Sequence, residues 1–349
     1  MNYHIVLPRV VNLTQIAKDA ECHKCPRHSM WLLCQELNAT IHEPKDLSTN
    51  LYDQINSKLI GSPELWSLAR NLASQVNSDD CIFCLAEAGG LQVAAVCGAK
   101  PNRPKICMFV HNLDRPRGRL SLKLWRVAER VDLFLVCSQQ QFEFLTQYLN
   151  LPSSKVKFIW DQTDIKFFTP GLSSPNKPRP LIVSVGLEQR DYRTLAAATG
   201  NLNVDVRISG FSQDAAVLAK TFPENIPANM SRRFYSWTEL LQLYRDADVV
   251  VVSLKENKYA AGVQSLMEAM ACQRPVVVTA TTGLQHYLQS DVVTCIKPGD
   301  IEQMQQAIVH ILKYPEKADE NAQRGYQLAQ ERHNIDNFVA EMTHYLKSL

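Results

Sequence analysis

The chain of 349 residues lacks the features that mark membrane-spanning, secreted and nucleic-acid-binding proteins. No apolar run approaches the roughly 18 to 20 residues that a membrane span needs. The apolar stretch at residues 3–7 is too short for a secretory signal and is interrupted by Pro8 and Arg9. Lys and Arg outnumber Asp and Glu by only 37 to 35, so no nucleic-acid partner is expected. We therefore expect a cytoplasmic protein.

The composition supplies enough apolar material for packed cores. Hydrophobic residues make up 46% of the chain and charged residues 21%, which excludes a disordered protein. The length corresponds to roughly two domains. Ten cysteines in a chain without a secretory signal predict reduced thiols.

Two C-x-x-C pairs, Cys22/Cys25 and Cys81/Cys84, are spaced like the halves of a zinc site. However, residues 81–85 have the pattern of a strand, in which side chains three apart point to opposite faces and cannot bind one ion. Ordinary thiols are the favoured interpretation, and we expect no metal site.

Apolar strand candidates alternate with helical stretches along the whole chain. The strand candidates are residues 3–7, 40–42, 81–85, 105–110, 133–137, 156–160, 181–185, 204–208, 249–252, 276–279 and 292–296, and the helical stretches include 29–37, 65–76, 91–96, 121–130 and 139–149. This alternation predicts mostly parallel, doubly wound sheets. The polar, proline-rich residues 173–180 interrupt it and predict an interdomain linker.

The sequence thus predicts an α/β protein with two doubly wound, Rossmann-like domains that face each other across a cleft. We expect the N-terminal domain over residues 1–170, the linker over 171–180 and the C-terminal domain over 181–330. A last helix over 331–349 is expected to pack back on the N-terminal domain.

The segment 246–283 is the most informative part of the chain. An all-valine strand at 249–252 leads through a loop into a helix that starts near Gly262. No Ser, Thr, Asp or Asn occupies the expected capping positions, so the first backbone N–H groups of that helix are open to an anion such as a diphosphate. Glu268, about two turns in, would then reach a neighbouring sugar hydroxyl. The alternative is a buried crossover helix whose Glu268 faces solvent.

Residues 100–130 are locally basic. Nine Lys and Arg side chains in this stretch face only Asp114 and Glu129, and leucines, Trp125 and Val127 are interleaved with them. A cationic amphipathic helix over 115–130 could lie on an anionic membrane, which would place the protein at the inner face of that membrane. A solvated charged face over a packed one is the alternative.

Several motifs, taken in order, resemble family-four glycosyltransferases of the GT-B fold. They include Phe109-Val110-His111-Asn112, the stretch 240–250, and Glu268-Ala269-Met270-Ala271 followed by Arg274-Pro275. The resemblance covers most of the chain. It implies a retaining enzyme that uses a nucleotide-diphosphate sugar, with the acceptor on the N-terminal domain and the donor on the C-terminal one.

The resemblance also implies a set of donor-binding residues. Glu268 matches the glutamate that holds the ribose hydroxyls, and Arg190 matches a basic residue on the phosphates. The remaining donor-binding residues implied are Gly186, Gly262, Val263, Gln264, Tyr235 and Ser236, the last two near the nucleobase. The alternative for Arg190 is a surface salt bridge with Asp191 or Glu188.

Two residues of the N-terminal domain are further candidates for catalysis. His111 follows an apolar strand and matches a family histidine that contacts the donor sugar, although a histidine at such a position is often structural. Glu87 also follows a strand, and Gly89 and Gly90 would allow a ligand close to the backbone. Glu87 is expected to bind the acceptor or act as a base, or alternatively to cap the next helix.

The chain also departs from the family pattern. Ala260 stands eight residues before Glu268, where members usually carry a second glutamate, and Leu187 replaces a common basic residue. Glu256 could supply the missing carboxylate. These departures indicate a divergent member.

We therefore expect a metal-independent, retaining glycosyltransferase that needs no cofactor. Its acceptor is a small molecule, a glycan or a lipid-linked molecule. The alternative is a catalytically silent protein of the same fold that binds a nucleotide sugar or supports a partner enzyme. A nicotinamide-dependent dehydrogenase is disfavoured because no G-x-G-x-x-G follows the first strand of either domain.

Overall fold

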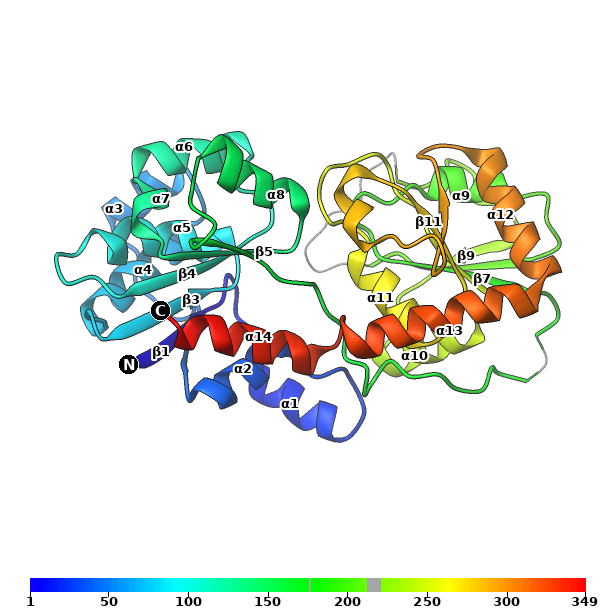
Figure 1. Cartoon of the computed structure of the whole chain (residues 1–349), viewed down its shortest axis with the longest axis horizontal. Helices are drawn as coiled ribbons and strands as arrows, with labels where there is room; N and C mark the ends of the chain where they lie inside the picture. The colour runs from blue at the N-terminus through cyan, green and yellow to red at the C-terminus, as the bar shows by residue number, and fades with distance from the viewer. Residues whose placement is uncertain (176, 212–220) are drawn as a thin grey trace. The chain divides into compact units, whose positions relative to one another are not determined.

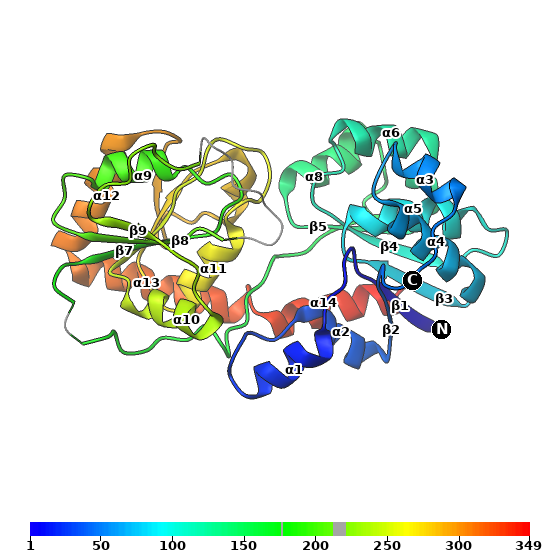
Figure 2. The same ribbon diagram turned by 180° about the vertical axis from the view of Figure 1, so that it is seen from behind.

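The structure of the chain is a computed structural model, which describes residues 1–175, 177–211 and 221–349. It divides into two compact units. The first comprises residues 1–18, 28–159 and 338–349, and the second comprises residues 19–27 and 160–337. Each unit contains one six-stranded parallel sheet with helices on its faces (Figure 1 and Figure 2). The expected pair of parallel α/β domains is thereby confirmed.

The sheet of the first unit has the strand order β2-β1-β3-β4-β5-β6, and each neighbouring pair is parallel. Its strands are β1 (Asn2–Val6), β2 (Thr40–His42), β3 (Asp80–Cys84), β4 (Lys105–Val110), β5 (Leu133–Val136) and β6 (Val156–Phe158). β3 and β5 are buried along their whole length. β5 is uniformly apolar, as a strand covered on both faces should be, whereas β3 begins with Asp80, which accepts a hydrogen bond from the Asn2 amide at 2.8 Å.

The helices around this sheet follow the strands in sequence. They are α2 (Ser29–Leu37), α3 (Leu51–Ser57), α4 (Pro63–Gln75), α5 (Glu87–Val96), α6 (Pro116–Leu124), α7 (Val127–Arg130) and α8 (Gln139–Glu143), with a 3₁₀ turn at Cys97–Ala99 and a π-helical segment at Phe144–Tyr148. Two helices run from one unit into the other: α1 (Leu13–Glu21) and α14 (Ile335–Lys347).

The sheet of the second unit has the order β12-β11-β10-β7-β8-β9. Its strands are β7 (Leu181–Val185), β8 (Asp205–Ser209), β9 (Met230–Arg232), β10 (Val249–Val252), β11 (Val276–Thr279) and β12 (Thr294–Ile296). From β7 the chain adds β8 and β9 on one side and then returns to add β10, β11 and β12 on the other. The order therefore reverses between β7 and β10, and ligands of doubly wound sheets bind at the carboxyl ends of the strands at such a point.

Helices cover both faces of the second sheet. They are α9 (Tyr192–Thr199), α10 (Trp237–Asp246), α11 (Val263–Ala271), α12 (Ile301–Lys313) and α13 (Pro315–Glu331), with a 3₁₀ helix at Thr282–Tyr287. Alternate valines of β10 serve the two faces: Val250 and Val252 pack with α10 and α11, and Val249 and Val251 pack with α9 and α12. This explains why the strand has no polar position.

Several features differ from the sequence-based expectations, and one of them is the helix α3, which was not expected. The helix expected over 121–130 is two helices, because Arg126 adopts a left-handed φ of 50° and separates α6 from α7. The strand β9 was not expected. The contacts also place the boundary between the units at Ile159 and Trp160 rather than within residues 171–180. Residues 338–349 belong to the first unit.

Candidate donor site

The loops after β7, β10 and β11 are bonded together at one edge of the second sheet. Arg190 and Leu254 form an antiparallel bridge between the first two loops, and the Lys255 N–H donates to the Gln189 carbonyl at 2.9 Å. The Gly283 N–H donates to the carbonyl of Asn257 at 3.0 Å and ties in the third loop. The three loops therefore form one surface at the strand ends, where the order of the sheet reverses.

The helix α11 begins at this surface. Gly262 precedes it with a left-handed φ of 90°, and no side chain caps the helix. A Cβ at Gly262 would lie 2.9 Å from Cγ1 of Val252 and 3.1 Å from Cδ1 of Leu254. Any residue other than glycine would therefore clash with these side chains. The positive end of α11 thus carries no side-chain acceptor of its own. Val263 and Gln264 form its first turn.

Glu268 is buried inside the second unit, with 5% of its surface exposed. The Tyr244 hydroxyl donates to its Oε2 at 2.7 Å, and the Gln264 amide nitrogen lies 3.3 Å from its Oε1. Burial raises the pKa of Glu268 to about 7, although these hydrogen bonds and the charge of Arg190 act in the opposite direction. The alternative that Glu268 faces solvent is wrong.

Arg190 is also buried, with 4% of its surface exposed. Its Nε donates to the Val185 carbonyl at 2.9 Å, Nη1 to the Glu188 carbonyl at 3.0 Å and Nη2 to Ser265 Oγ at 2.9 Å. The alternative of a surface salt bridge is wrong, because Glu188 contributes its carbonyl and the Asp191 carboxylate caps α9. Arg190 instead connects the end of β7 to the first turn of α11.

Gly186 provides the space in which this guanidinium lies. Its φ is 100°, and a Cβ there would lie 2.4 Å from Nη2 of Arg190. The Gly186 N–H donates to the Ser209 carbonyl at 2.9 Å, and its own carbonyl accepts a hydrogen bond from the Tyr192 hydroxyl. A larger residue at this position would displace Arg190.

Tyr235 and Ser236 lie at the start of α10. Tyr235 is buried, and the Arg233 guanidinium lies 3.7 Å from the centre of its ring. The Ser236 N–H and Oγ both donate to Oε2 of Glu239 at 2.9 Å, which forms a capping box. A nucleobase role for this turn stays a prediction.

The structure shows what surrounds Ala260, the position at which the resemblance implies a second glutamate. Ala260 lies in the loop before α11, and Oε1 of Glu256 in the same loop accepts hydrogen bonds from the Thr282 N–H at 3.1 Å and its hydroxyl at 2.9 Å. Glu256 therefore links the loops after β10 and β11. Leu187 is buried with 5% exposure and offers no charge to the surface.

Two members of this site, Tyr244 and Ser265, were not predicted from the sequence. Tyr244 is fully buried and lies 24 residues from the Glu268 it contacts. Ser265 lies three residues after Gly262, within the first turn of α11, and receives the Arg190 hydrogen bond. The sequence pointed to these residues only through the segments that contain them: Tyr244 lies in the 240–250 motif and Ser265 at the start of the predicted helix.

In the first unit, Glu87 and His111 lie at the carboxyl ends of neighbouring strands. Oε1 of Glu87 accepts hydrogen bonds from the backbone N–H groups of His111, at 2.7 Å, and of Asn112. The His111 side chain is exposed, its ring centre is 4.8 Å from that of Phe109, and its Nδ1 is 3.9 Å from Cys137 Sγ. Glu87 thus fixes the loop that carries His111 rather than capping the helix that follows it.

The two glycines after Glu87 serve packing. Gly89 has a φ of 93°, and a Cβ there would lie 3.3 Å from Cγ1 of Val6. A Cβ at Gly90 would lie 2.9 Å from two atoms of Met108. The glycines allow this segment to lie against strands β1 and β4.

The ten cysteines are free thiols. Cys81 and Cys84 are buried in β3, and burial raises the pKa of both thiols. Within the described ranges, no three His, Cys, Asp or Glu side chains are placed to hold a metal ion.

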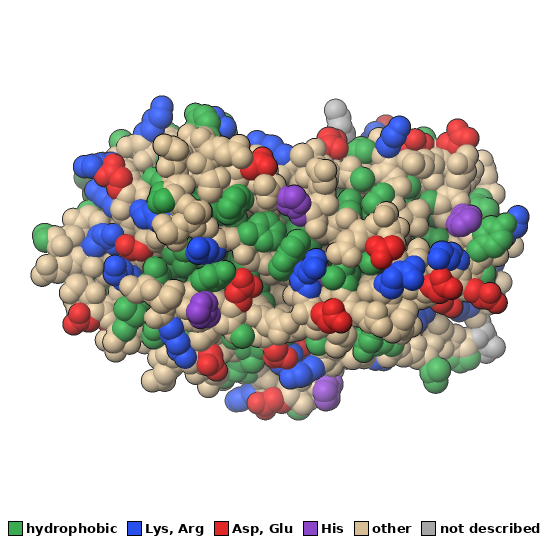
Figure 3. Space-filling view, viewed as in Figure 1, with side chains coloured by type: hydrophobic (Ala, Val, Ile, Leu, Met, Phe, Trp, Pro, Cys, Tyr) green, Lys and Arg blue, Asp and Glu red, His purple; other side chains and the backbone are tan. Residues whose placement is uncertain are grey.

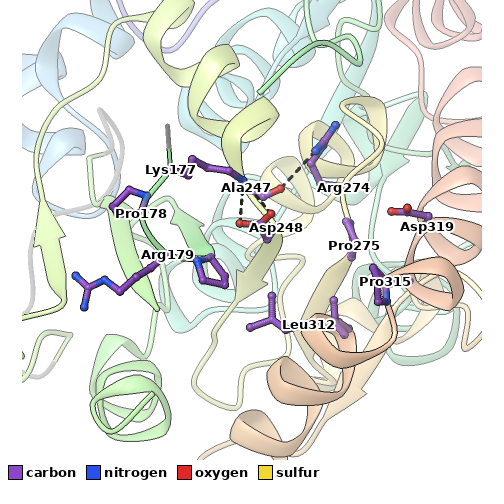
Figure 4. A pocket seen from close by; sticks show the side chains of 13 residues that line it. Lys177, Pro178, Arg179, Ala247, Asp248, Arg274, Pro275, Leu312, Pro315 and Asp319 are labelled. Atoms are coloured by element: carbon purple, nitrogen blue, oxygen red, sulfur yellow. Dashed lines mark hydrogen bonds and ion pairs between the residues drawn. The ribbon is translucent and has the colours of Figure 1, made fainter. Parts of the chain in front are cut away.

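The second unit also contains a cavity of about 490 Å³ (Figure 4). Pro180, Asp248 and Pro275, which line it, directly precede β7, β10 and β11. The cavity therefore lies at the amino ends of these strands, opposite to the surface at α11. Three cations line it: Lys177 donates to Asp248 and Arg274 to the Ala247 carbonyl, and Arg179 pairs with Asp205. These protein partners make it a poor site for the donor's diphosphate.

Comparison with known proteins gives the class of this fold. Residues 182–314, all in the second unit, match the family model described as Glycosyl transferases group 1. A search of curated proteins by sequence finds no match.

Solved glycosyltransferase structures resemble the whole chain. The Anabaena protein HepE in complex with UDP-glucose is 14% identical, with a TM-score of 0.70 and full coverage of both chains. Sucrose-phosphate synthase from Thermosynechococcus elongatus is 16% identical, with a TM-score of 0.70 and coverage of 100% of this chain and 98% of its own. A glycosyltransferase from Rickettsia africae is 12% identical, with a TM-score of 0.68 and coverage of 99% and 98%. At these identities the likeness establishes the GT-B fold.

Proposed function

We propose that the protein is a glycosyltransferase that moves a sugar from a nucleotide-diphosphate sugar to an acceptor, with retention of anomeric configuration. The observation that carries this proposal is the uncapped amino end of α11, beside two buried ionisable groups, at the point where the strand order reverses. The match of residues 182–314 to a glycosyltransferase family and the GT-B neighbours support it.

In the proposed complex, the diphosphate lies against the N–H groups of Val263 and Gln264. The ribose hydroxyls donate to Glu268, whose Oε1 exchanges the 3.3 Å contact with the Gln264 amide for a substrate hydroxyl. Arg190 adds positive charge next to the first turn of α11. These groups need no metal, so chelators should leave turnover unchanged.

The proposed transfer occurs on one face of the donor sugar. The bond between the anomeric carbon and the diphosphate oxygen breaks, and the electron pair leaves with the diphosphate. The acceptor hydroxyl forms the new bond on the same face and passes its proton to the departing diphosphate. The α11 amides and Arg190 stabilise the charge that develops. His111 is proposed to contact the donor sugar, and Glu87 holds the His111 loop.

A thermal-shift screen with UDP-, GDP- and ADP-sugars tests donor binding. A ligand at a hundred times its Kd stabilises the folded state by about 2.7 kcal/mol, which is measurable. Stabilisation by one nucleotide class, lost in Glu268→Ala, is the expected result. If none of these donors stabilises the protein, the proposed donor site is wrong.

The departures at Ala260 and Leu187 favour a second candidate, a protein of this fold that binds the donor without turning it over. Saturable donor binding with neither hydrolysis nor transfer to a broad panel of acceptors would identify it. Transfer to any acceptor would exclude it, and the configuration of the product would decide between retention and inversion.

A further inference from the structure

The helix α3 presents its apolar side chains to solvent and buries a charge. Leu51, Tyr52 and Ile55 are 72, 45 and 54% exposed, and Leu59, two residues after the helix, is 40% exposed. Asp53 points inward with no exposed surface and accepts hydrogen bonds from Arg70 at 2.7 and 2.6 Å. This inversion exposes a stripe of large apolar side chains that the unit does not use for its own core.

The helix α6 has a similar exposed face. Leu120 and Leu124, one turn apart, are 47 and 52% exposed, whereas Ser121 and Gly118 are buried. Arg117 and Lys123 are exposed on the same helix. The nine residues of α6 contain no acidic side chain, and the single acid of α3 is the buried Asp53.

An aromatic chain joins the two helices. Tyr52 of α3 meets Trp66 edge-on at 5.9 Å between ring centres, and Trp66 lies 5.1 Å from Trp125, the residue that ends α6. Figure 1 and Figure 2 both draw α3 and α6 at the same end of the first unit. Figure 3 shows basic and hydrophobic side chains side by side over α6. We call this surface the α3–α6 face: Leu51, Tyr52, Ile55, Lys58, Leu59, Arg117, Leu120, Lys123 and Leu124.

Most other cations of the basic segment already have protein partners. Arg103 bonds to Asp132, Arg130 to the Ala95 carbonyl, and Arg126 to Glu129. By contrast, among the residues that the structure describes, no side chain pairs with Arg117 or Lys123. The cations nearest the exposed leucines therefore have their charges available for an external anion.

We propose that the α3–α6 face docks on the surface of an anionic lipid bilayer. Two helices that expose large aliphatic side chains beside Arg and Lys have the chemistry of an interfacial anchor. The aliphatic groups enter the acyl boundary while the cations meet the lipid phosphates. A protein partner would place Lys123 in the centre of an interface, where lysine is depleted. The proposal concerns the first unit alone and does not depend on donor binding or turnover.

The test is flotation of the full chain with two kinds of vesicle, phosphatidylcholine alone and phosphatidylcholine with phosphatidylglycerol. We expect binding to the mixed vesicles that decreases with added salt. The charge variant Arg117→Glu with Lys123→Glu should weaken binding by more than about tenfold, since each basic residue near an anionic surface contributes roughly fivefold. The apolar variant Leu120→Gln with Leu124→Gln should also lose binding.

Matched controls lie in the second unit. Lys313→Glu with Lys317→Glu makes the same change of charge, and Ile301→Gln with Val309→Gln removes two exposed aliphatic side chains. Both controls should bind as the unchanged protein does. All substituted residues are exposed, so circular dichroism and melting temperature should stay constant in every variant.

Three outcomes would overturn the proposal. The first is no binding of the unchanged protein to anionic vesicles, and the second is equal loss in the variants and their controls. The third is a dimer in solution that Leu120→Gln with Leu124→Gln dissociates, because a second copy would then be the occupant of the face. If donor sugars raise the melting temperature but the protein does not bind vesicles, the proposed enzyme activity would stand and the proposed membrane surface would be rejected.

Discussion

At the scale of single residues, Glu268 carries the most distinctive chemistry of the second unit. A carboxylate in a buried position costs free energy unless partners compensate, and Tyr244 and Gln264 compensate only in part. Its pKa is therefore raised by burial to about 7. A ligand hydroxyl that replaces the Gln264 amide would therefore meet a Glu268 carboxyl group that is mostly ionised only above about pH 7.

This raised pKa predicts a stability profile. The folded state binds the Glu268 carboxyl proton more tightly than the unfolded chain does. The contribution of this proton to the free energy of unfolding is therefore fully present below about pH 4. It is lost as the pH rises through about 7. The free energy of unfolding should therefore fall from pH 5 to pH 8 in the unchanged protein by up to a few kcal/mol more than in Glu268→Gln. Urea unfolding at the two pH values measures this, with the exposed Glu239→Gln as control. Parallel profiles for the unchanged protein and Glu268→Gln would contradict it.

Arg190 should combine a structural and a catalytic effect. Its three hydrogen bonds are buried, so Arg190→Ala should lower the free energy of unfolding by about 2 kcal/mol or more. Arg190→Lys keeps the charge but cannot form the same fork, and we expect it to lower donor turnover by roughly a hundredfold.

Melting temperature and turnover, measured on the same preparations, separate the two effects of Arg190. Ser265→Ala is the matched control, because it removes one acceptor of the guanidinium and leaves the charge. If Arg190→Lys turns over donor at the normal rate, the proposed role of Arg190 at the diphosphate is wrong.

A feature of a single residue could be predicted from the sequence where it depends only on the residue types next to it in the chain. The open helix start at Gly262 was predicted because the absence of capping side chains is visible in the chain. The burial of Glu268 was not, because it depends on Tyr244 in another helix. The same holds for Glu87, whose partners are backbone N–H groups 24 and 25 residues away.

At the scale of elements, the loop before α11 is defined by a glycine. Gly262→Ala should destabilise the protein for two reasons, a left-handed φ and a Cβ 2.9 Å from Val252. Gly299 provides a control, since it also has a left-handed φ of 73° but a Cβ added there would have nothing within 4 Å. We expect about 1 kcal/mol of destabilisation for Gly299→Ala and at least about 2 kcal/mol for Gly262→Ala. Equal costs in urea unfolding would show that the contact with Val252 is relieved by small shifts.

The elements that were predicted correctly are those whose pattern is dictated by the core. β10 and the three valines of β11 are apolar because both faces are covered, and β4 was placed at its observed bounds. The helix α3 escaped prediction because its apolar residues face outward. The break between α6 and α7 depends on the left-handed backbone conformation of Arg126, which the residue pattern does not predict.

At the scale of the whole molecule, the two units each contain a six-stranded parallel sheet but differ in strand order and in what their strand ends offer. The loops of the second unit meet at an uncapped helix, whereas those of the first unit are held together by Glu87 and leave the His111 side chain exposed. No helix among the described residues is long and apolar enough to cross a bilayer.

This difference predicts where a nucleoside diphosphate protects the chain from hydrogen exchange. UDP, GDP or ADP, whichever stabilises the protein, should slow exchange in residues 186–191 and 262–266, because these backbone groups surround the proposed diphosphate. Residues 311–319, several of which line the cavity at the opposite edge of the same sheet, should exchange at an unchanged rate. Protection of 311–319 without protection of 262–266 would move the nucleotide to that cavity, and the amino end of α11 would then lose its proposed role.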